Sequence, residues 1–307
     1  MKAAQSDRPE PDAEGRSVTL RARDIGPGSP GHRQRPAPWL ALAAPLALLR
    51  RDRELIAALI ARDVDSQVRG TVLGRVWLVF GPIFMLIVYT LVFGVILNSR
   101  WQDRTDEAFL FPLIYFSGLI LFGLFFDSLS RAPNLMRDNK AFIQKIVFPV
   151  ESLCLAVVGA SLIKFCIGLS ILAAFYLALR GLPPPAAMAY PPVLAGLVLF
   201  SLGATWILAG LAVFFRDLAH VMHPLSMLLL FLSPLFYPLE RVPATLQTVV
   251  LIANPLAYPL EATRNALFFG EWPSMTGVLV YLALGWLFAL AGYRLFMRLR
   301  PGFADVI

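Results

Sequence analysis

The sequence predicts an all-α integral membrane protein, and three observations lead to this fold class. Hydrophobic residues make up 58% of the 307 residues, and only 15% are charged, whereas ordinary soluble domains carry about 25% charged residues. Apolar stretches that approach the roughly 20 residues needed to cross a bilayer recur along the chain. The net charge of +7 fits a concentration of basic residues on the cytoplasmic side better than it fits nucleic-acid binding.

The N-terminal region is expected to lie outside the membrane core. Residues 1–37 are polar and rich in Pro, Gly, Arg and Asp, which predicts a disordered cytoplasmic segment. Residues 38–72 form an interfacial region, in which 39–49 are apolar but too short to span and are interrupted by Pro45.

Residues 53–69 are predicted to form an amphipathic helix. Its apolar side chains follow helical spacing and are Leu55, Ile56, Leu59, Ile60, Val64 and Val68. We expect this helix to lie in the membrane surface with its apolar face toward the acyl chains. An ordinary soluble amphipathic helix is the alternative.

Six spans are expected within residues 73–300. They cover residues 76–97, 108–126, 153–179, 193–215, 221–237 and 275–296. The fifth is shorter and contains Pro224 and Pro234. An even number of spans places both termini on one side. The basic residues of the N-terminal region and of the segments beside the tail 301–307 favour the cytoplasm, although Arg180, Arg241 and Arg264 fall outside.

The stretch "RAPNLMRDNKAFIQKIVFP" (131–149) lies between the second and third spans. It is too charged for a membrane span, and its interleaved large apolar side chains are more than a solvent loop needs. The topology places it in the cytoplasm, so it is expected to contact a partner there.

Residues 238–272 contain two short amphipathic runs, 242–253 and 260–269, separated by "NPLAYP". Each run is too short to cross a bilayer. Two re-entrant helices in the outer leaflet, covered by the rest of the protein, fit this pattern. Two helices resting on the outer surface are the alternative.

The sequence carries no motif for ATP hydrolysis or for metal chemistry in this chain. Its only lysines are Lys2, Lys140, Lys145 and Lys164, and none follows a glycine as a phosphate-binding loop requires. The motifs HExxH, GxSxG and CxxC do not occur. Asp217, His220 and His223 share one helical face, but no second cluster supplies further ligands, so no metal site and no cofactor are expected.

A candidate translocation path follows from the residues inside the spans. Lys164 lies deep in the third span, where a charge costs about 2.5–3.5 kcal/mol on insertion scales, so it should face the bundle interior or snorkel. The first two spans are rich in aromatic residues, which suit sugar rings and isoprenoid chains but equally suit packing against lipid. The candidate path residues are Tyr89, Phe93, Tyr115, Phe116, Phe125 and Lys164.

An ordered set of motifs resembles a known family. "LIARDVDSQVRGTVLGRVWLVFGPIFMLIVYTLVFGVI", with Gly70, Leu73, Gly74, Trp77 and Pro82, is similar to the opening of the permease subunits of polysaccharide and polyol-phosphate ABC exporters. The motifs that follow in order are "FPLIYFSGL" (111–119), "KIVFPVE" (145–151), "FFRDLAH" (214–220), "LSPLFYPLERVP" (232–243), "NPLAYPLEATRNALF" (254–268) and "GFADVI" (302–307). The resemblance covers about residues 46–307.

The resemblance implies an ABC-2 type permease that works as a homodimer with two separate ATPase subunits, which bind ATP and Mg. Such a protein moves a lipid-linked polysaccharide of the O-antigen or teichoic-acid kind across the bacterial inner membrane. A capsule-polysaccharide permease is the second reading. A membrane-embedded transferase for lipid-linked glycans is a third, with Asp217, His220 and His223 as the nearest catalytic groups. An ion-coupled transporter is a weaker alternative, because the predicted spans contain no paired carboxylates and the sequence shows no evident inverted repeat.

The resemblance also implies roles for particular residues. The segment 131–149 becomes the coupling helix that docks in a groove of the ATPase, with Arg137, Asp138, Asn139, Lys140, Phe142, Ile143 and Lys145 as its contacts. The helix over 53–69 also reaches the ATPase through Arg62, Asp63 and Arg69. The short helices after the fifth span form an outer gate with Pro243, Asn254, Pro255, Tyr258, Glu261 and Arg264.

Overall fold

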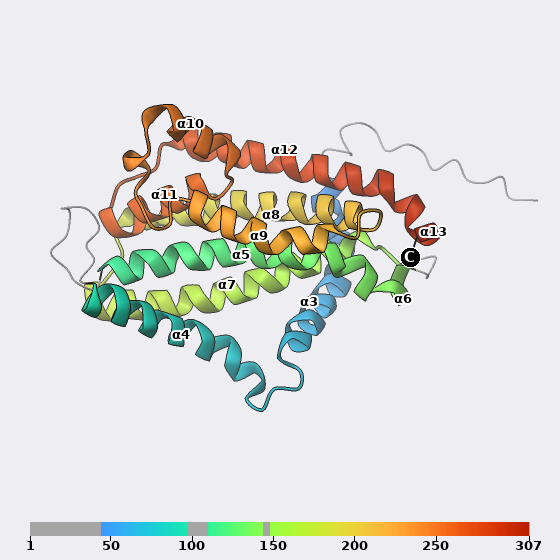
Figure 1. Ribbon diagram of the computed structural model, residues 1–307, viewed down its shortest axis with the longest axis horizontal. Coiled ribbons are helices and arrows are strands. Elements are labelled where there is room, and N and C mark those ends of the chain that lie inside the picture. The colour runs from blue at the N-terminus through green and yellow to red at the C-terminus, as the bar shows by residue number, and fades with distance from the viewer. Residues whose placement is uncertain (1–43, 98–109, 144–147, 307) are drawn as a thin grey trace, which may run out of the picture. The chain divides into compact units, whose positions relative to one another are not determined.

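The structure is a computed structural model that describes residues 44–97, 110–143 and 148–306. Every regular element within these ranges is helical, which confirms the predicted all-α fold (Figure 1). The prediction for residues 1–37 lies outside the described residues.

Five helical segments of the described chain are long and apolar enough to cross a membrane. They are Gly74–Ile96, Leu110–Asp138, Glu151–Arg180, Pro185–Ala212 and Met275–Gly302. The predicted fifth span is instead α9, Leu218–Leu232, with 15 residues and Pro224 inside it. A helix of that length is about 22 Å long, short of the roughly 30 Å hydrocarbon core. Six full-length spans are therefore not found in the part of the chain that the structure describes.

The chain enters the bundle through two helices and a glycine turn. Helix α2 covers Ala44–Arg51 and α3 covers Arg53–Val68, as the sequence predicted for 53–69. Gly70 and Gly74 then adopt positive φ angles of 83° and 50°, which glycine reaches without a steric penalty. Helix α4, Trp77–Tyr89, follows and continues as a π-helical segment, Thr90–Ile96.

Part of the apolar face of α3 packs on protein rather than on lipid. Ile56 and Leu59 are each only 5% exposed and belong to the core cluster that also contains residues of α7, Glu151–Arg180. Ile60 lies so close to Gly159 of α7 that a Cβ there would be 2.4 Å from its Cδ1 atom. The expectation that these side chains face the acyl chains is wrong, because α7 offers a small-residue surface that α3 covers.

The charged stretch 131–149 is divided between two helices. Helix α5 runs from Leu110 to Asp138. The first eight residues of the stretch, 131–138, therefore continue a span instead of forming a separate coupling helix. Ala132, Leu135 and Met136 are buried on the inner face of α5, whereas Arg137 is exposed. This explains the mixture of apolar and charged residues. The separate helix is α6, which is confined to Lys140–Ile143.

Helix α8, Tyr190–Ala212, packs closely against α12, Met275–Leu299. Glycines on both helices let the backbones approach. A Cβ on Gly292 would lie 2.4 Å from the carbonyl oxygen of Gly203, and one on Gly285 would lie 2.9 Å from the carbonyl oxygen of Gly196. Small residues at such crossings permit the backbone contact that stabilises helix pairs in membranes.

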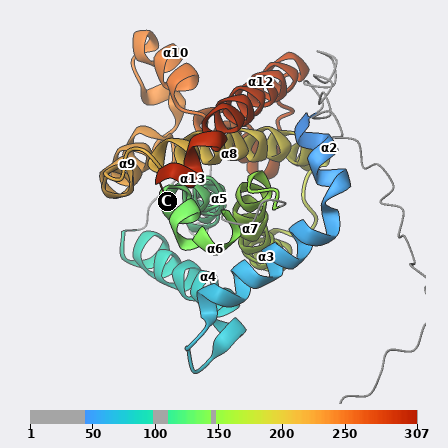
Figure 2. The same ribbon diagram turned by 90° about the vertical axis from the view of Figure 1, so that its right-hand side faces the viewer.

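The remaining helices lie at the two ends of the bundle. Helices α10, Ala244–Ala253, and α11, Ala257–Arg264, confirm two short helices in the region 238–272, and a π-helical segment, Asn265–Phe269, extends α11. In Figure 1 they lie at the opposite end from α6 and the short α13, Phe303–Val306, and Figure 2 views the molecule from the end that carries α6 and α13. Their depth in a membrane stays a prediction.

Candidate functional site

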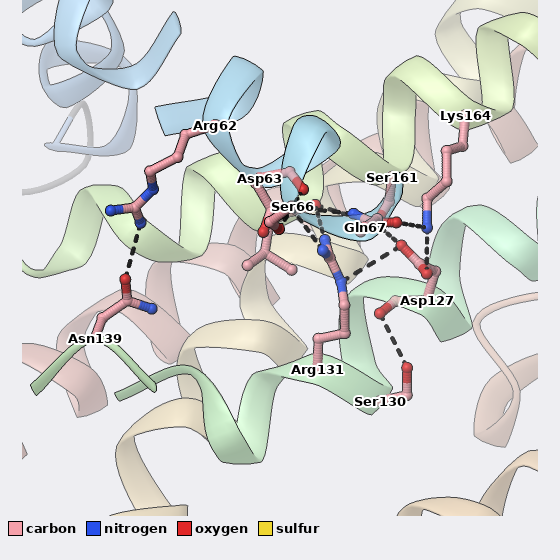
Figure 3. A network of polar contacts seen from close by, with 11 residues as sticks. Arg62, Asp63, Ser66, Gln67, Asp127, Ser130, Arg131, Asn139, Ser161 and Lys164 are labelled. Atoms are coloured by element: carbon pink, nitrogen blue, oxygen red, sulfur yellow. Dashed lines mark hydrogen bonds and ion pairs between the residues drawn. The ribbon is translucent and has the colours of Figure 1, made fainter. Parts of the chain in front are cut away.

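A network of charged and polar side chains joins α3, α5 and α7 (Figure 3). Its members, here called the junction network, are Asp63 and Gln67 of α3, Asp127 and Arg131 of α5, and Ser161 and Lys164 of α7. Asp127 and Arg131 are one helical turn apart, so they point to the same side of α5. Three segments that are distant in sequence are therefore linked at one place.

Asp127 is the centre of this network. One carboxylate oxygen accepts from Lys164 Nζ at 2.5 Å, and the other accepts from Ser161 Oγ at 2.5 Å. Lys164 Nζ also donates to Gln67 Oε1 at 2.8 Å, which extends the network to α3.

Arg131 makes the second link to α3. It donates to the carboxylate of Asp63 at 2.6 Å and to the carbonyl oxygen of Val157 at 2.9 Å. Its Nε atom lies 3.6 Å from the carboxylate of Asp127. A single arginine thus contacts all three helices.

The charges of the junction network balance, with two cations and two carboxylates. The four charged side chains are between 22% and 28% exposed. An unpaired charge on such a partly buried side chain would be unfavourable, whereas pairing and hydrogen bonding offset the free-energy cost of desolvation. The network therefore holds α3 against α5 and α7 at a defined place.

Sequence reasoning found Lys164 but missed its main partner. Asp127 lies one residue beyond the predicted end of the second span at 126, so its carboxylate was not counted inside the membrane region. The i, i+4 spacing of Asp127 and Arg131 was the available signal. The prediction that Lys164 faces the bundle interior is refined, since its ammonium group is held between α5 and α3.

An apolar crevice of about 360 Å³ opens beside the network, between α4, α5 and α7. Tyr89, Phe116 and Lys164, all predicted path residues, line it together. Tyr89 stacks edge-on against Tyr115 at 4.9 Å, and Phe93 lies 5.2 Å from Tyr115. Phe125 is only 4% exposed and belongs to the core. A translocation role for these residues stays a prediction.

Contacts between α3 and α6 bring together residues that the sequence assigned to two coupling elements. Arg62 donates to Asn139 Oδ1 at 2.8 Å, and its guanidinium lies 4.8 Å from the centre of the Phe142 ring. Asp138 and Lys140 are exposed nearby, and Arg69 is exposed at the end of α3. Lys145 and the side chain of Ile143 lie outside the described residues.

The predicted gate residues tie the short helices to the bundle. Asn254 is buried, donates to Ser233 Oγ at 2.8 Å and accepts from the Leu256 amide at 2.9 Å. Arg264 donates to Glu261 at 2.9 Å and also to the carbonyl of Pro234.

Two further contacts, both with Tyr281 of α12, lie at this end of the bundle. The Pro255 carbonyl accepts from the Tyr281 hydroxyl at 2.7 Å, and the Tyr258 ring lies 5.0 Å from the Tyr281 ring. Pro243 directly precedes α10. Their role as an outer gate stays a prediction.

Asp217, His220 and His223 lie exposed at the start of α9. The described residues contain no group of three or more His, Cys, Asp or Glu side chains placed to hold a metal ion.

The bundle, its span-length apolar helices and its polar junction define a multi-pass α-helical membrane protein. The family model of the ABC-2 type transporter matches residues 54–268, and the chain belongs to this family. The matched region includes α3, the junction network, α6 and the short helices α10 and α11.

Relatives of the chain include two permeases of defined name. It is 28% identical to the O-antigen export system permease protein RfbA of Myxococcus xanthus over 190 residues. This aligned region covers 62% of this chain and 70% of the relative. It is 23% identical to a protein of the same name from Klebsiella pneumoniae over 256 residues. That aligned region covers 83% of this chain and 95% of the relative.

Proposed function

We propose that the chain is the transmembrane subunit of an ABC exporter that moves a lipid-linked, O-antigen-like polysaccharide across the cytoplasmic membrane. The observation that carries this proposal is the similarity to O-antigen export permeases over as much as 83% of the chain. Membership of the ABC-2 type transporter family supports the same mechanism class.

The working assembly in this proposal is a homodimer with two ATPase subunits, which bind ATP and Mg and carry out the hydrolysis. The sequence supports this division, because none of its four lysines follows a glycine as in a phosphate-binding loop. The permease contributes the membrane pathway, and ATP hydrolysis in its partners drives its conformational change.

The proposed topology places the end of the bundle with α6 and α13 in the cytoplasm, together with both termini. Basic residues are concentrated toward this end, as expected for the inner side. They are Arg137, Lys140, Arg216, Arg294 and Arg298. Helix α9 and the segment around Pro234 would complete a sixth, partly non-helical crossing, which the neighbouring helices must then cover.

Coupling is proposed to pass through α6 and the end of α5, which dock in the ATPase, and through α3. Arg62 supports this route because it contacts Asn139 and Phe142 at the point where α3 meets α6. A displacement of α6 would reach α3 there and pass on to α5 and α7 through the junction network. The crevice beside Lys164 and the helices α10 and α11 are the proposed path and outer gate.

The test is co-isolation of the full-length chain with a tagged ABC ATPase from the same gene cluster, together with export in cells that lack the natural permease. Phe142→Asp should abolish co-isolation and export while the protein still inserts. Leu182→Asp is the matched control, since Leu182 is 87% exposed in the loop that follows α7 at the opposite end. Normal export by the Phe142 variant would contradict the coupling role of α6, and failure of the wild-type chain to bind the ATPase would contradict the function.

A further inference from the structure

A second cavity, of about 310 Å³, lies at the same end of the bundle as α6. Three cations surround it: Arg137 at the end of α5, Lys140 on α6, and Arg216 in the connection between α8 and α9. The described residues that line this cavity, here called the basic pocket, include no acidic residue. Arg216 comes from a part of the chain that sequence reasoning did not connect with coupling.

The floor of the basic pocket is apolar and well packed. Pro133 and Met136 of α5 and Val213 beyond α8 form part of it, and Met136 is only 1% exposed. Val306 of α13 closes another side. A fixed apolar floor beneath three cations presents their charges toward one entering group.

Two cations near this end of the bundle, unlike the three that surround the pocket, are paired with carboxylates. Arg131 is paired with Asp63, and Arg300 donates to Glu151 at 3.0 Å. By contrast, no ion pair or hydrogen bond is found for the side chains of Arg137, Lys140 and Arg216 in the described part of the chain. Like charges that share a pocket repel one another, so an anionic group that enters it is favoured.

We propose that the basic pocket receives an acidic side chain of the ATPase subunit, a second contact beside α6 that fixes the orientation of the docked partner. This inference rests on the proposed function. The described lining comes from the last turns of α5 and α8, from the connection that follows α8, from α6 and from α13, so the pocket lies at the end of the spans. A lipid would need an apolar wall for its acyl chains, whereas a protein carboxylate needs only the cations and the short floor.

The test measures the affinity of the full-length permease, in nanodiscs of zwitterionic lipid, for the purified ATPase. Arg216→Glu should lower the affinity at least tenfold, and Arg216→Gln should lower it less. Arg298→Glu is the control, because Arg298 is exposed near the same end on α12 but lies outside the pocket, and it should change the affinity less than twofold. Added salt should weaken wild-type binding more than binding by the Arg216→Glu variant.

A photo-reactive amino acid in place of Arg216 identifies the occupant directly. A cross-link to the ATPase supports the proposal, whereas a cross-link to lipid, to a second permease copy or to the permease's own C-terminal residues overturns it. If wild-type permease binds the ATPase and Arg216→Glu behaves like the Arg298 control, the inference fails alone. If wild-type permease does not bind at all, the proposed function fails with it.

Discussion

Two contacts within the bundle are built on opposite physical principles. Helices α8 and α12 meet through glycines, with the Gly203 carbonyl so close to Gly292 that even a methyl group would clash at 2.4 Å. Beyond its apolar contact with α7, helix α3 meets α5 and α7 through charges, with Asp127, Arg131 and Lys164 as the main links. The first contact depends on shape at short range, and the second on partners that can be exchanged.

The difference indicates which part of the protein is suited to move. Backbones in direct contact slide only if the glycine surface separates, so we expect α8 and α12 to move together. Ion pairs at side chains that are about a quarter exposed can break and re-form with water or with another partner. We therefore expect motion that starts at α6 to reach the bundle through α3 rather than through α12.

The largest loss of stability is expected from a substitution that breaks the glycine contact. Gly292→Ala places a methyl group against the backbone of Gly203, which cannot rotate away, and should lower the free energy of unfolding by about 3 kcal/mol. Gly123→Ala on α5 is the matched control, because a Cβ there meets no atom within 4 Å. Thermal unfolding of the purified proteins in detergent measures both, and equal stability of the two variants would refute the close contact.

Removal of the central carboxylate should have the next largest effect. Asp127→Ala leaves Lys164 and Arg131 without their shared partner and should destabilise the protein by about 1–3 kcal/mol, less than for a fully buried pair because these groups are partly exposed. The double variant Asp127→Ala, Lys164→Met should be more stable than the sum of the single changes predicts. Strict additivity in this double-mutant cycle would show that the pair does not interact.

A smaller difference in stability is expected between the partly buried and the exposed ion pairs of α3. Arg131→Met should lower the free energy of unfolding by about 1 kcal/mol, since its side chain is 24% exposed and contacts three helices. Arg75→Met should change it by less than about 0.5 kcal/mol, because Arg75 is 75% exposed although it lies 2.7 Å from Asp65. Chemical unfolding monitored by tryptophan fluorescence ranks the two, and a larger loss at Arg75 would reverse the comparison.

Periodicity and length were sufficient to predict the helices, but not the contacts between them. The spacing of Leu55, Ile56 and Leu59 predicted α3, and hydropathy predicted the long spans. The sequence did not reveal that α7 covers α3, because which surface meets an apolar face depends on residues about 100 positions away. It also placed the end of the second span before Asp127, so the centre of the junction network was missed.

The candidate site was predicted unevenly for the same reason. Arg62, Asn139 and Phe142 were assigned to two coupling elements, and the structure brings them together. Arg131 was seen only as part of the stretch 131–149, although it is a link to α3. Arg216 was seen only as a basic residue on the inner side, since nothing near it in the sequence indicates that α5 and α6 share a pocket with it.

The central claim is that this chain provides the membrane pathway for a lipid-linked glycan and that a separate subunit provides the energy. The most direct measurement reconstitutes the chain with its ABC ATPase in proteoliposomes that carry a lipid-linked glycan on the ATPase side. A membrane-impermeant glycan-binding protein then reports the glycan on the other side. The account predicts that the glycan appears there only when both subunits and Mg-ATP are present. Appearance without the ATPase, or none with the complete system, would contradict it.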